Sequence, residues 1–160
     1  MDFEIVPVTS PAGLDFRGIA RLTIVAWGRQ VDAAEVDRRA RDLEMEVGGL
    51  DQTMRGIFIA KTPTATVGFC RTVRDADDRT YWWLIGIVVH SDRRRLGIGK
   101  ALVLDCIAYA RARGARAIRS ETHANNDLSI CFHEGVGFSN DGRFTAADGD
   151  EKIAFSLELH

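Results

Sequence analysis

Residues 85–103 read IGIVVHSDRRRLGIGKALV and decide the fold more than any other part of this chain. An apolar run ends at Val89, and a short polar connection follows. The basic, glycine-containing stretch Arg94–Lys100 then leads into residues 101–110, whose only charged side chain is Asp105. This order predicts a strand, a glycine-rich turn and a buried helix.

The turn in this segment has the features of an anion site. A helix N-terminus presents unpaired backbone N–H groups and the positive end of the helix dipole. Gly97 and Gly99 let a phosphate approach the backbone closely, because glycine has no Cβ. The three arginines at 93–95 and Lys100 add positive charge at the same place. The sequence therefore predicts an anion site, with a pyrophosphate as the expected ligand.

Two common glycine-rich phosphate loops do not fit this turn. The nucleoside triphosphate loop requires a glycine five positions before Gly99 and Ser or Thr after the lysine, but Arg94 and Ala101 stand there. The dinucleotide fingerprint requires Gly or Ala where this chain has Leu102. The pattern that fits is the acyl-CoA loop, (Arg/Gln)-x-x-Gly-x-(Gly/Ala), which is filled by Arg94, Gly97 and Gly99.

A second motif lies downstream at residues 126–138, NDLSICFHEGVGF. It resembles the pattern Asn-x-x-(Ala/Ser)-x-x-(Leu/Phe)-Tyr-Glu-x-x-Gly-Phe, and the matching positions are Asn126, Ser129, Phe132, Glu134, Gly137 and Phe138. His133 stands where Tyr is usual. With both motifs, the chain resembles the GNAT superfamily of acyl-CoA-dependent N-acyltransferases. The resemblance is specific from around residue 57 to the C-terminus. The residues before that are compatible with the family pattern but do not by themselves indicate it.

The resemblance implies a fold and an activity. The implied fold is α/β, with a central, mostly antiparallel, twisted sheet, a V-shaped splay and about four flanking helices. The implied reaction transfers the acetyl group of acetyl-CoA directly to a primary amine in a ternary complex, with a small-molecule acceptor favoured. A protein N-terminus or lysine is the alternative acceptor. A non-catalytic acyl-CoA-binding regulatory module is the alternative from another class, and O-acylation or a longer acyl donor is a third.

Hydrophobic periodicity predicts the remaining elements. Strands are expected at Phe3–Val8, Ile57–Lys61, Ala65–Arg74, Thr80–Val89, Ala117–His123, Phe138–Phe144 and Lys152–Leu159. Helices are expected at Asp15–Trp27, Val31–Val47, 97–113 and Asp127–Gly135. The order β-α-α-β-β-β-α-β-α-β-β is the one that the resemblance implies, and residues 1–160 are expected to form a single GNAT domain.

Composition limits the class of protein. The 160 residues are 46% hydrophobic and 28% charged, with a net charge of −2, which is ordinary for a soluble globular domain and gives no reason to expect nucleic acid binding. No apolar run could cross a membrane, and the N-terminus lacks the basic and apolar parts of a signal peptide. Cys70, Cys106 and Cys131 show no metal-ligand spacing and are typical of a reducing cytoplasm. We therefore expect a cytoplasmic protein without a metal; a homodimer is expected only because many members of the family form one.

The resemblance also implies where the cofactor binds. The backbone of Ile87, Val88 and Val89 would hold the pantetheine arm and polarise the thioester carbonyl, even where their side chains are ordinary core residues. The strand Thr80–Val89 would splay from Ala117–His123 and open a slot. The pyrophosphate would lie on Arg94, Arg95, Leu96, Gly97, Ile98, Gly99 and Lys100. Asn126 is expected to hydrogen-bond the pantetheine arm, to cap the following helix, or both.

Acyl transfer to an amine needs a base, a donor to the carbonyl oxygen and a proton for the departing thiolate. Glu121 lies five residues before Asn126, an offset at which some members of the family carry a general base, although it could be an ordinary solvated strand residue. His123 projects to the same face and is the second candidate. His133 replaces the Tyr that protonates the thiolate; an unperturbed histidine is only partly protonated at neutral pH, so it would donate a neutral N–H, pass on the substrate's proton, or only pack near the cofactor.

Candidate acceptor contacts come from tryptophans and acidic residues. Trp82 and Trp83 face opposite sides of one strand, so at most one of them lines an acceptor pocket, and Trp27 is a third candidate. Each is otherwise a core residue. Acidic side chains that could attract a cationic amine are Asp32, Glu35, Asp75, Asp77 and Asp78, although a run of charge is more often a solvated turn.

Overall fold

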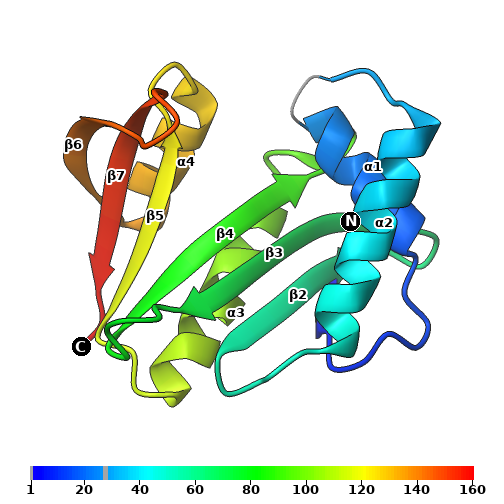
Figure 1. The fold of residues 1–160 in the computed structure, drawn as a ribbon, viewed down its shortest axis with the longest axis horizontal. Coiled ribbons are helices and arrows are strands. Elements are labelled where there is room, and N and C mark those ends of the chain that lie inside the picture. The colour runs from blue at the N-terminus through cyan, green and yellow to red at the C-terminus, as the bar shows by residue number, and fades with distance from the viewer. Residues whose placement is uncertain (1, 27–28) are drawn as a thin grey trace.

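The structure, a computed structural model, describes residues 2–26 and 29–160. A seven-stranded sheet in the order β1-β2-β3-β4-β5-β7-β6 forms its centre (Figure 1). The strands are β1 (Glu4–Pro7), β2 (Arg55–Lys61), β3 (Thr66–Arg74), β4 (Tyr81–Val89), β5 (Ala117–His123), β6 (Ser139–Thr145) and β7 (Glu151–Glu158). The helices are α1 (Phe16–Ala26), α2 (Ala33–Gly48), α3 (Ile98–Ala112), α4 (Asp127–Val136) and the short 3-10 helix η1 (Ser91–Arg93). The predicted order of elements is confirmed.

The helices cover the two halves of the sheet unequally. In the half made by β2, β3 and β4, α1 and α2 lie on one face and α3 lies on the other (Figure 1). All five inner residues of β2, 56–60, are therefore buried, as expected for a strand that is covered on both faces. In the other half, α4 covers one face of β5, and the strand alternates between buried Ser120 and Thr122 and exposed Glu121 and His123. The second face of this half is consequently open to solvent.

The strands β4 and β5 separate along their length. They are parallel and pair only at their first residues, with Trp83 opposite Arg119 as the last pair. Gly86 has a φ of 68° and lies where the pairing of β4 with β3 shifts register, so it forms a β-bulge that turns the end of β4. Figure 1 shows β4 diverging from β5 toward its C-terminal end. The predicted V-shaped splay is therefore confirmed.

The core on the α3 side contains two of the three cysteines. Cys70 of β3 and Cys106 of α3 are buried there with their sulfur atoms 3.5 Å apart, and burial raises the pKa of the Cys106 thiol. Cys131 is exposed on α4. In the described ranges, 2–26 and 29–160, no helix is long and apolar enough to span a membrane.

Candidate active site

The loop between β4 and α3 leaves the first turn of α3 open. Arg95 and Gly97 both adopt left-handed backbone conformations, with φ of 64° and 83°. Gly97 is the N-cap residue of α3 and supplies no side-chain hydrogen bond to the helix. The first backbone N–H groups of α3 thus lack the capping acceptor that such groups usually find in the N-cap side chain. They are available to an anion.

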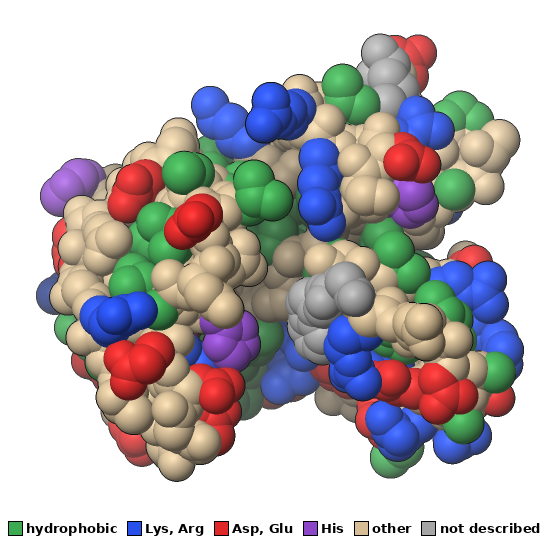
Figure 2. All heavy atoms as spheres, turned by 90° about the horizontal axis from the view of Figure 1, so that it is seen from above, with side chains coloured by type: hydrophobic (Ala, Val, Ile, Leu, Met, Phe, Trp, Pro, Cys, Tyr) green, Lys and Arg blue, Asp and Glu red, His purple; other side chains and the backbone are tan. Residues whose placement is uncertain are grey.

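Basic side chains surround this open helix end. Three of these side chains are exposed, namely Arg94, Arg95 and Lys100. Nε of Arg94 donates a hydrogen bond of 3.4 Å to the carbonyl oxygen of Val89 at the end of β4. Figure 2, which looks into the splay, shows Lys and Arg side chains beside the hollow between the two halves of the molecule. Leu96 is also exposed, whereas the side chain of Ile98 is buried in the core. The predicted loop residues therefore lie together at one end of the splay.

The predicted strand residues lie beside this loop. Ile87 and Val89 pack against the core on the α3 side, and Val88 is buried in the cluster under α1 and α2. All three follow Trp83, the last residue of β4 that pairs with β5. Their side chains are core residues and their backbone borders the splay, so only the backbone is placed to meet a ligand. That it does so remains a prediction.

Gly99 marks a close approach of three elements at the base of the loop. A Cβ at Gly99 would lie 3.0 Å from Cε2 of Phe132 on α4 and 3.6 Å from Cγ2 of Val89 on β4. A Cβ here would meet Val89 at an ordinary contact distance but would press on the Phe132 ring, which would have to move by a few tenths of an ångström. On α4 itself, the side chain of Asn126 accepts the backbone N–H of Ser129 at 3.1 Å. The predicted helix cap is confirmed, and the contact of Asn126 with pantetheine remains a prediction.

The two candidate bases lie on the open face of β5. Glu121 comes two residues after the last pair with β4, where the splay begins. Its Oε2 lies 3.9 Å from Nζ of Lys152, and Nδ1 of His123 lies 3.8 Å from Oδ2 of Asp150. Both candidates are exposed, so the desolvation cost of a buried carboxylate does not arise at Glu121. The prediction that they share a face is confirmed, and their role as base stays a prediction.

A shallow depression of about 260 Å³ adjoins Glu121 on this open face. Its aromatic part is formed by Tyr81 and Trp83, and the guanidinium carbon of Arg119 lies 3.7 Å from the centre of the Tyr81 ring. Trp83 is thus the tryptophan that lines a pocket, whereas Trp82 is fully buried. The prediction that the two rings face opposite sides of β4 is confirmed, the part of Trp83 in binding an acceptor remains a prediction, and Trp27 lies outside the described residues.

Three charged residues of the depression, Arg119, Asp141 and Glu158, were not identified from the sequence. Arg119 precedes Glu121 by two positions in a strand with alternating burial, so the strand period could have identified it. Asp141 and Glu158 come from β6 and β7 and reach the depression only because β7 pairs with β5 and β6 pairs with β7. The charged side chains of the lining are three carboxylates and one guanidinium. Even with the Lys152 ammonium 3.9 Å from Glu121, negative charge is in excess, so the depression favours a positively charged ligand.

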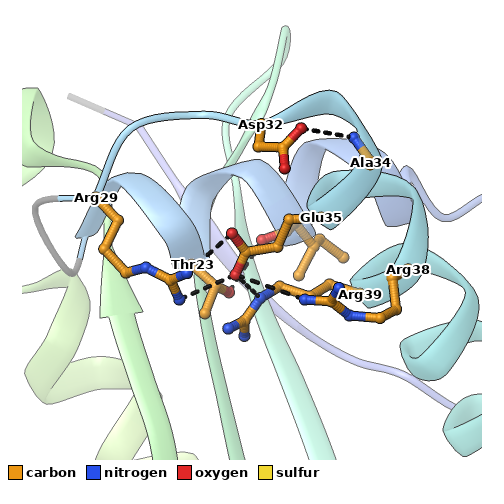
Figure 3. Close-up of polar contacts among 8 residues, drawn as sticks. Thr23, Arg29, Asp32, Ala34, Glu35, Arg38 and Arg39 are labelled. Carbon is orange, nitrogen blue, oxygen red and sulfur yellow. Dashed lines mark hydrogen bonds and ion pairs between the residues drawn. The ribbon is translucent and has the colours of Figure 1, made fainter.

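The acidic side chains near the start of α2 are engaged within the protein. Asp32 caps α2 by accepting the backbone N–H of Ala34 at 3.1 Å. Glu35 is buried, and its Oε1 lies 2.9 Å from Nη1 of Arg29 and 3.0 Å from Nε of Arg39 (Figure 3). The suggestion that Glu35 attracts a substrate cation is therefore wrong, because this buried carboxylate is already paired with two arginines. Asp32 caps α2 while its side chain stays exposed, so its attraction of a cation remains a prediction.

The acidic turn before β4 lies at the surface, and two of its three carboxylates accept hydrogen bonds from neighbouring residues. Oδ2 of Asp75 accepts the indole N–H of Trp83 at 2.8 Å, and Oδ1 accepts the backbone N–H groups of Asp77 and Asp78. These hydrogen bonds, the one from Trp83 first, lower the pKa of the Asp75 carboxyl. Asp78 accepts the backbone N–H and the hydroxyl of Thr80. Asp75 thus orients the Trp83 ring, and the acidic run forms a surface turn, as the alternative interpretation of a solvated turn predicted.

His133 lies under α4, between that helix and the strands β5 and β7. It is 4% exposed, and its ring stacks on Phe155 with 4.5 Å between the ring centres. Its Nε2 lies 2.8 Å from Oγ of Ser120, and its Nδ1 lies 2.7 Å from the carbonyl oxygen of Ser129. Burial lowers the pKa of His133 below its ordinary value. Both ring nitrogens thus have protein partners, and the predicted role as catalytic acid stays untested.

The splayed sheet and the open N-terminus of α3 are the features expected of the α/β proteins that hold an acyl-CoA within a split sheet. More particularly, the chain belongs to the GNAT acetyltransferases, because the profile described as "Acetyltransferase (GNAT) family" matches residues 20–138.

Three known proteins illustrate this similarity. An uncharacterized N-acetyltransferase of Methanocaldococcus jannaschii is 31% identical over 87 residues, which are 52% of this chain and 38% of that relative. The crystal structure of a protein assigned to the GNAT family from Desulfovibrio desulfuricans superposes with a TM-score of 0.80 at 20% identity, over 99% of this chain and 100% of that one. The crystal structure of the PaiA N-acetyltransferase of Thermoplasma acidophilum in complex with coenzyme A superposes with a TM-score of 0.74 at 17% identity, over 99% of this chain and 100% of that one. The two structures show a shared fold.

Proposed function

We propose that this protein is an N-acetyltransferase that moves the acetyl group of acetyl-CoA to the primary amine of a small molecule. The observation that carries this proposal is the open first turn of α3 beside the unpaired end of β4. An open helix end alone would accept many phosphates. A strand edge next to it favours a ligand whose amide-containing arm can pair with the backbone, as pantetheine does.

The loop and strand residues fit the parts of acetyl-CoA in order. The first turn of α3, together with Arg94, Arg95 and Lys100, would hold the pyrophosphate. The backbone of residues 87–89 would hold the pantetheine arm, and its N–H groups would polarise the thioester carbonyl. The basic side chains lie at the end of β4 and the exposed carboxylate of Glu121 lies where the splay begins, so the cofactor would run between them.

The reaction would then proceed by direct transfer. The amine nitrogen attacks the thioester carbon, the new C–N bond forms, the C–S bond breaks, and the sulfur leaves as a thiolate. The carboxylate of Glu121, which is accessible to solvent and to water, would take the proton that the amine loses. His123 is the second candidate for this step. The predicted proton donor to the thiolate is His133, and that assignment is the one the geometry supports least.

The depression beside Glu121 is the proposed acceptor site. Its volume of about 260 Å³ suits a small molecule, and its three carboxylates against one guanidinium favour an amine with a further positive charge. A peptide N-terminus or a lysine side chain could also enter it. A panel of diamines, amino sugars, amino acids and short peptides would separate these acceptors by kcat/KM.

The first test is calorimetric titration of the protein with acetyl-CoA and with acetyl-pantetheine, which lacks the pyrophosphate. We expect a Kd on the order of micromolar for acetyl-CoA, which is about −8 kcal/mol, and weaker binding of acetyl-pantetheine by at least about tenfold. Absence of binding by a folded sample would overturn the proposed function. Equal affinity for the two ligands would overturn the assignment of the loop.

The second test addresses the base. Glu121→Gln should lower kcat by about 100-fold, because general base catalysis contributes at least that factor, and should leave the Kd for acetyl-CoA unchanged. Glu158→Gln, in the same depression, is the matched control and should alter KM for a cationic amine rather than kcat. Unchanged turnover of Glu121→Gln at saturating substrates would show that the base lies elsewhere, and His123→Gln would then be measured.

A further inference from the structure

Among the histidines of the described residues, His133 alone is buried. Three elements hold its ring. The side chain of Ser120 comes from β5, the stacked Phe155 comes from β7, and the carbonyl group of Ser129 comes from α4 itself. Phe138, just after α4, packs edge-on with 5.4 Å between ring centres. The ring therefore connects α4 to both neighbouring strands.

The hydrogen bonds determine where the ring carries its proton. A carbonyl oxygen can only accept, so Nδ1, 2.7 Å from the carbonyl oxygen of Ser129, carries hydrogen. In a neutral imidazole the other nitrogen is then an acceptor, and the hydroxyl of Ser120 donates to Nε2 over 2.8 Å. The ring and hydrogen-bond partners within the described chain are Ser120, Ser129, Phe132, Phe138 and Phe155, none of which could stabilise an imidazolium by ion pairing.

The residue before His133 faces a different part of the molecule. Phe132 projects from α4 toward the start of α3, where a Cβ on Gly99 would lie 3.0 Å and 3.3 Å from two atoms of its ring. Helix α4 is thus attached to β5 and β7 through His133. On another side, through Phe132, it contacts the uncapped N-terminus of α3. A shift of α4 would move Phe132 against the loop.

We infer that His133 is a positioning residue: as a neutral ring with hydrogen on Nδ1, held by Ser120, it fixes α4 on β5 and β7 and thereby sets Phe132 against Gly99 at the acetyl-CoA loop. Its Nε2 accepts a hydrogen bond from the Ser120 hydroxyl, and its one N–H, on Nδ1, is donated to the carbonyl oxygen of Ser129, so in this arrangement no N–H of the ring is directed at a thiolate. The arrangement of the ring is independent of the proposed function, whereas its effect on acetyl-CoA rests on that function.

The direct test is long-range ¹H–¹⁵N NMR of the unaltered protein. We expect His133 to show protonated Nδ1 and unprotonated Nε2 at about pH 6.5, where an exposed histidine is half protonated. The exposed His123 serves as the internal reference in the same spectrum. A ring protonated on Nε2, or a doubly protonated ring at that pH, would overturn the inference.

A set of variants tests the effect on the loop. Ser120→Ala removes the hydrogen bond to Nε2, and His133→Phe removes it together with the one from Nδ1 to the carbonyl oxygen of Ser129. Ser129→Ala is the control, since it removes only the longer contact of the Ser129 hydroxyl with Nδ1, at 3.4 Å, and leaves the carbonyl acceptor in place. We expect the first two to lower Tm by about 2–5 °C and to weaken acetyl-CoA binding by about threefold to tenfold, with the double variant no worse than the sum of the two. The control should match the unaltered protein.

The kinetic outcome separates positioning from acid catalysis. A positioning role leaves kcat of His133→Phe at saturating acetyl-CoA within about threefold, whereas loss of a general acid would lower it by about 100-fold or more. A loss of that size with unchanged Kd, or a Ser120→Ala variant that matches Ser129→Ala in Tm and Kd, would refute the inference. If the unaltered protein binds no acetyl-CoA, the proposed function fails, and the NMR spectrum still decides the state of His133.

Discussion

The N-termini of α3 and α4 lie on the same face of the sheet but are built differently. In α4, Asn126 accepts the N–H of Ser129 and Asp127 stands in the first turn. In α3, Gly97 supplies no side-chain acceptor, the first turn has no acidic residue, and Lys100 lies within it. A helix that satisfies its own first turn gains stability. A helix that leaves this turn open keeps its N–H groups and its dipole for an anion.

The other two α-helices, α1 and α2, are capped by a side chain as α4 is. Asp15 accepts the N–H of Gly18 in α1 at 2.9 Å, and Asp32 accepts the N–H of Ala34 in α2. Helix α3 is thus the exception among the four α-helices of the described residues. The comparison teaches that a missing cap, in a chain that caps its other described helices, singles out α3 as the helix end that could accept an anion.

Gly97→Glu should close the open end most severely. Gly97 has a φ of 83° and nothing within 4 Å of the position of a Cβ, so the side chain would enter the space proposed for the ligand and add a negative charge there. We expect acetyl-CoA affinity to fall by about 100-fold or more, as measured by calorimetry. Gly114→Glu is the matched control, since Gly114 has a φ of 89° and equal space at the other end of α3. Unchanged affinity of Gly97→Glu would refute the loop assignment.

Gly99→Ala should disturb the uncapped N-terminus of α3 from the side that packs against Phe132. The added Cβ would press on Phe132 at 3.0 Å, and we expect acetyl-CoA to bind about tenfold more weakly because the start of α3 must shift. Phe132→Leu in the same protein should recover part of this loss by relieving the contact. Gly135→Ala, on α4 with nothing within 4 Å of the new Cβ, is the control. No recovery in the double variant would place the cause outside this contact.

Asn126→Ala should remove the cap of α4 without creating an anion site at that helix N-terminus. Loss of the cap should lower the free energy of unfolding by about 1 kcal/mol, measured by urea denaturation, and should weaken acetyl-CoA binding by no more than about threefold. Asn126→Asp keeps an acceptor for the N–H of Ser129 and should retain the stability. If Asn126→Asp binds acetyl-CoA far more weakly than the unaltered protein does, the amide itself contacts the cofactor.

A pH titration of the free energy of unfolding should show the smallest effect, which comes from His133, the residue that attaches α4 to β5 and β7. Burial lowers the pKa of His133 in the folded protein, so below about pH 6.5 the unfolded chain binds a proton that the folded chain does not. The stability contributed by the neutral ring is present above that pH and declines as the pH falls, by less than about 1.4 kcal/mol per pH unit. His133→Phe should lack this component, and His123→Gln should retain it. Equal slopes in all three proteins would contradict it.

Much of the fold could be predicted because its elements are marked locally. The alternation of Phe3–Val8, the glycines that end helices and the apolar run before Arg94 each depend on neighbouring residues. The order of elements was correct for that reason, and so was the divergence of β4 from β5, which came with the family resemblance. The loop residues could be grouped because they are contiguous, and contiguous residues stay together in any fold.

The acceptor side could not be predicted in the same way. Asp32, Glu35 and Asp75 carry the charge that a cationic amine would need, yet each is engaged by N–H groups or arginines of its own surroundings. The carboxylates that do face the depression include Asp141 and Glu158, which come from strands far apart in sequence from Trp83. A charge in a sequence does not show whether a partner within the protein has already bound it.

By itself, the sequence determined the position of the glycine-containing loop, the order of strands and helices along the chain and the identity of the family, since short-range patterns and contiguous motifs encode these properties. Only the tertiary structure decided that Trp83 rather than Trp82 lines the depression, that Glu121 is exposed beside it, and that His133 faces the core. These outcomes depend on which sheet face a helix covers. Strand pairing and helix packing between distant segments fix that choice, and no local pattern records it.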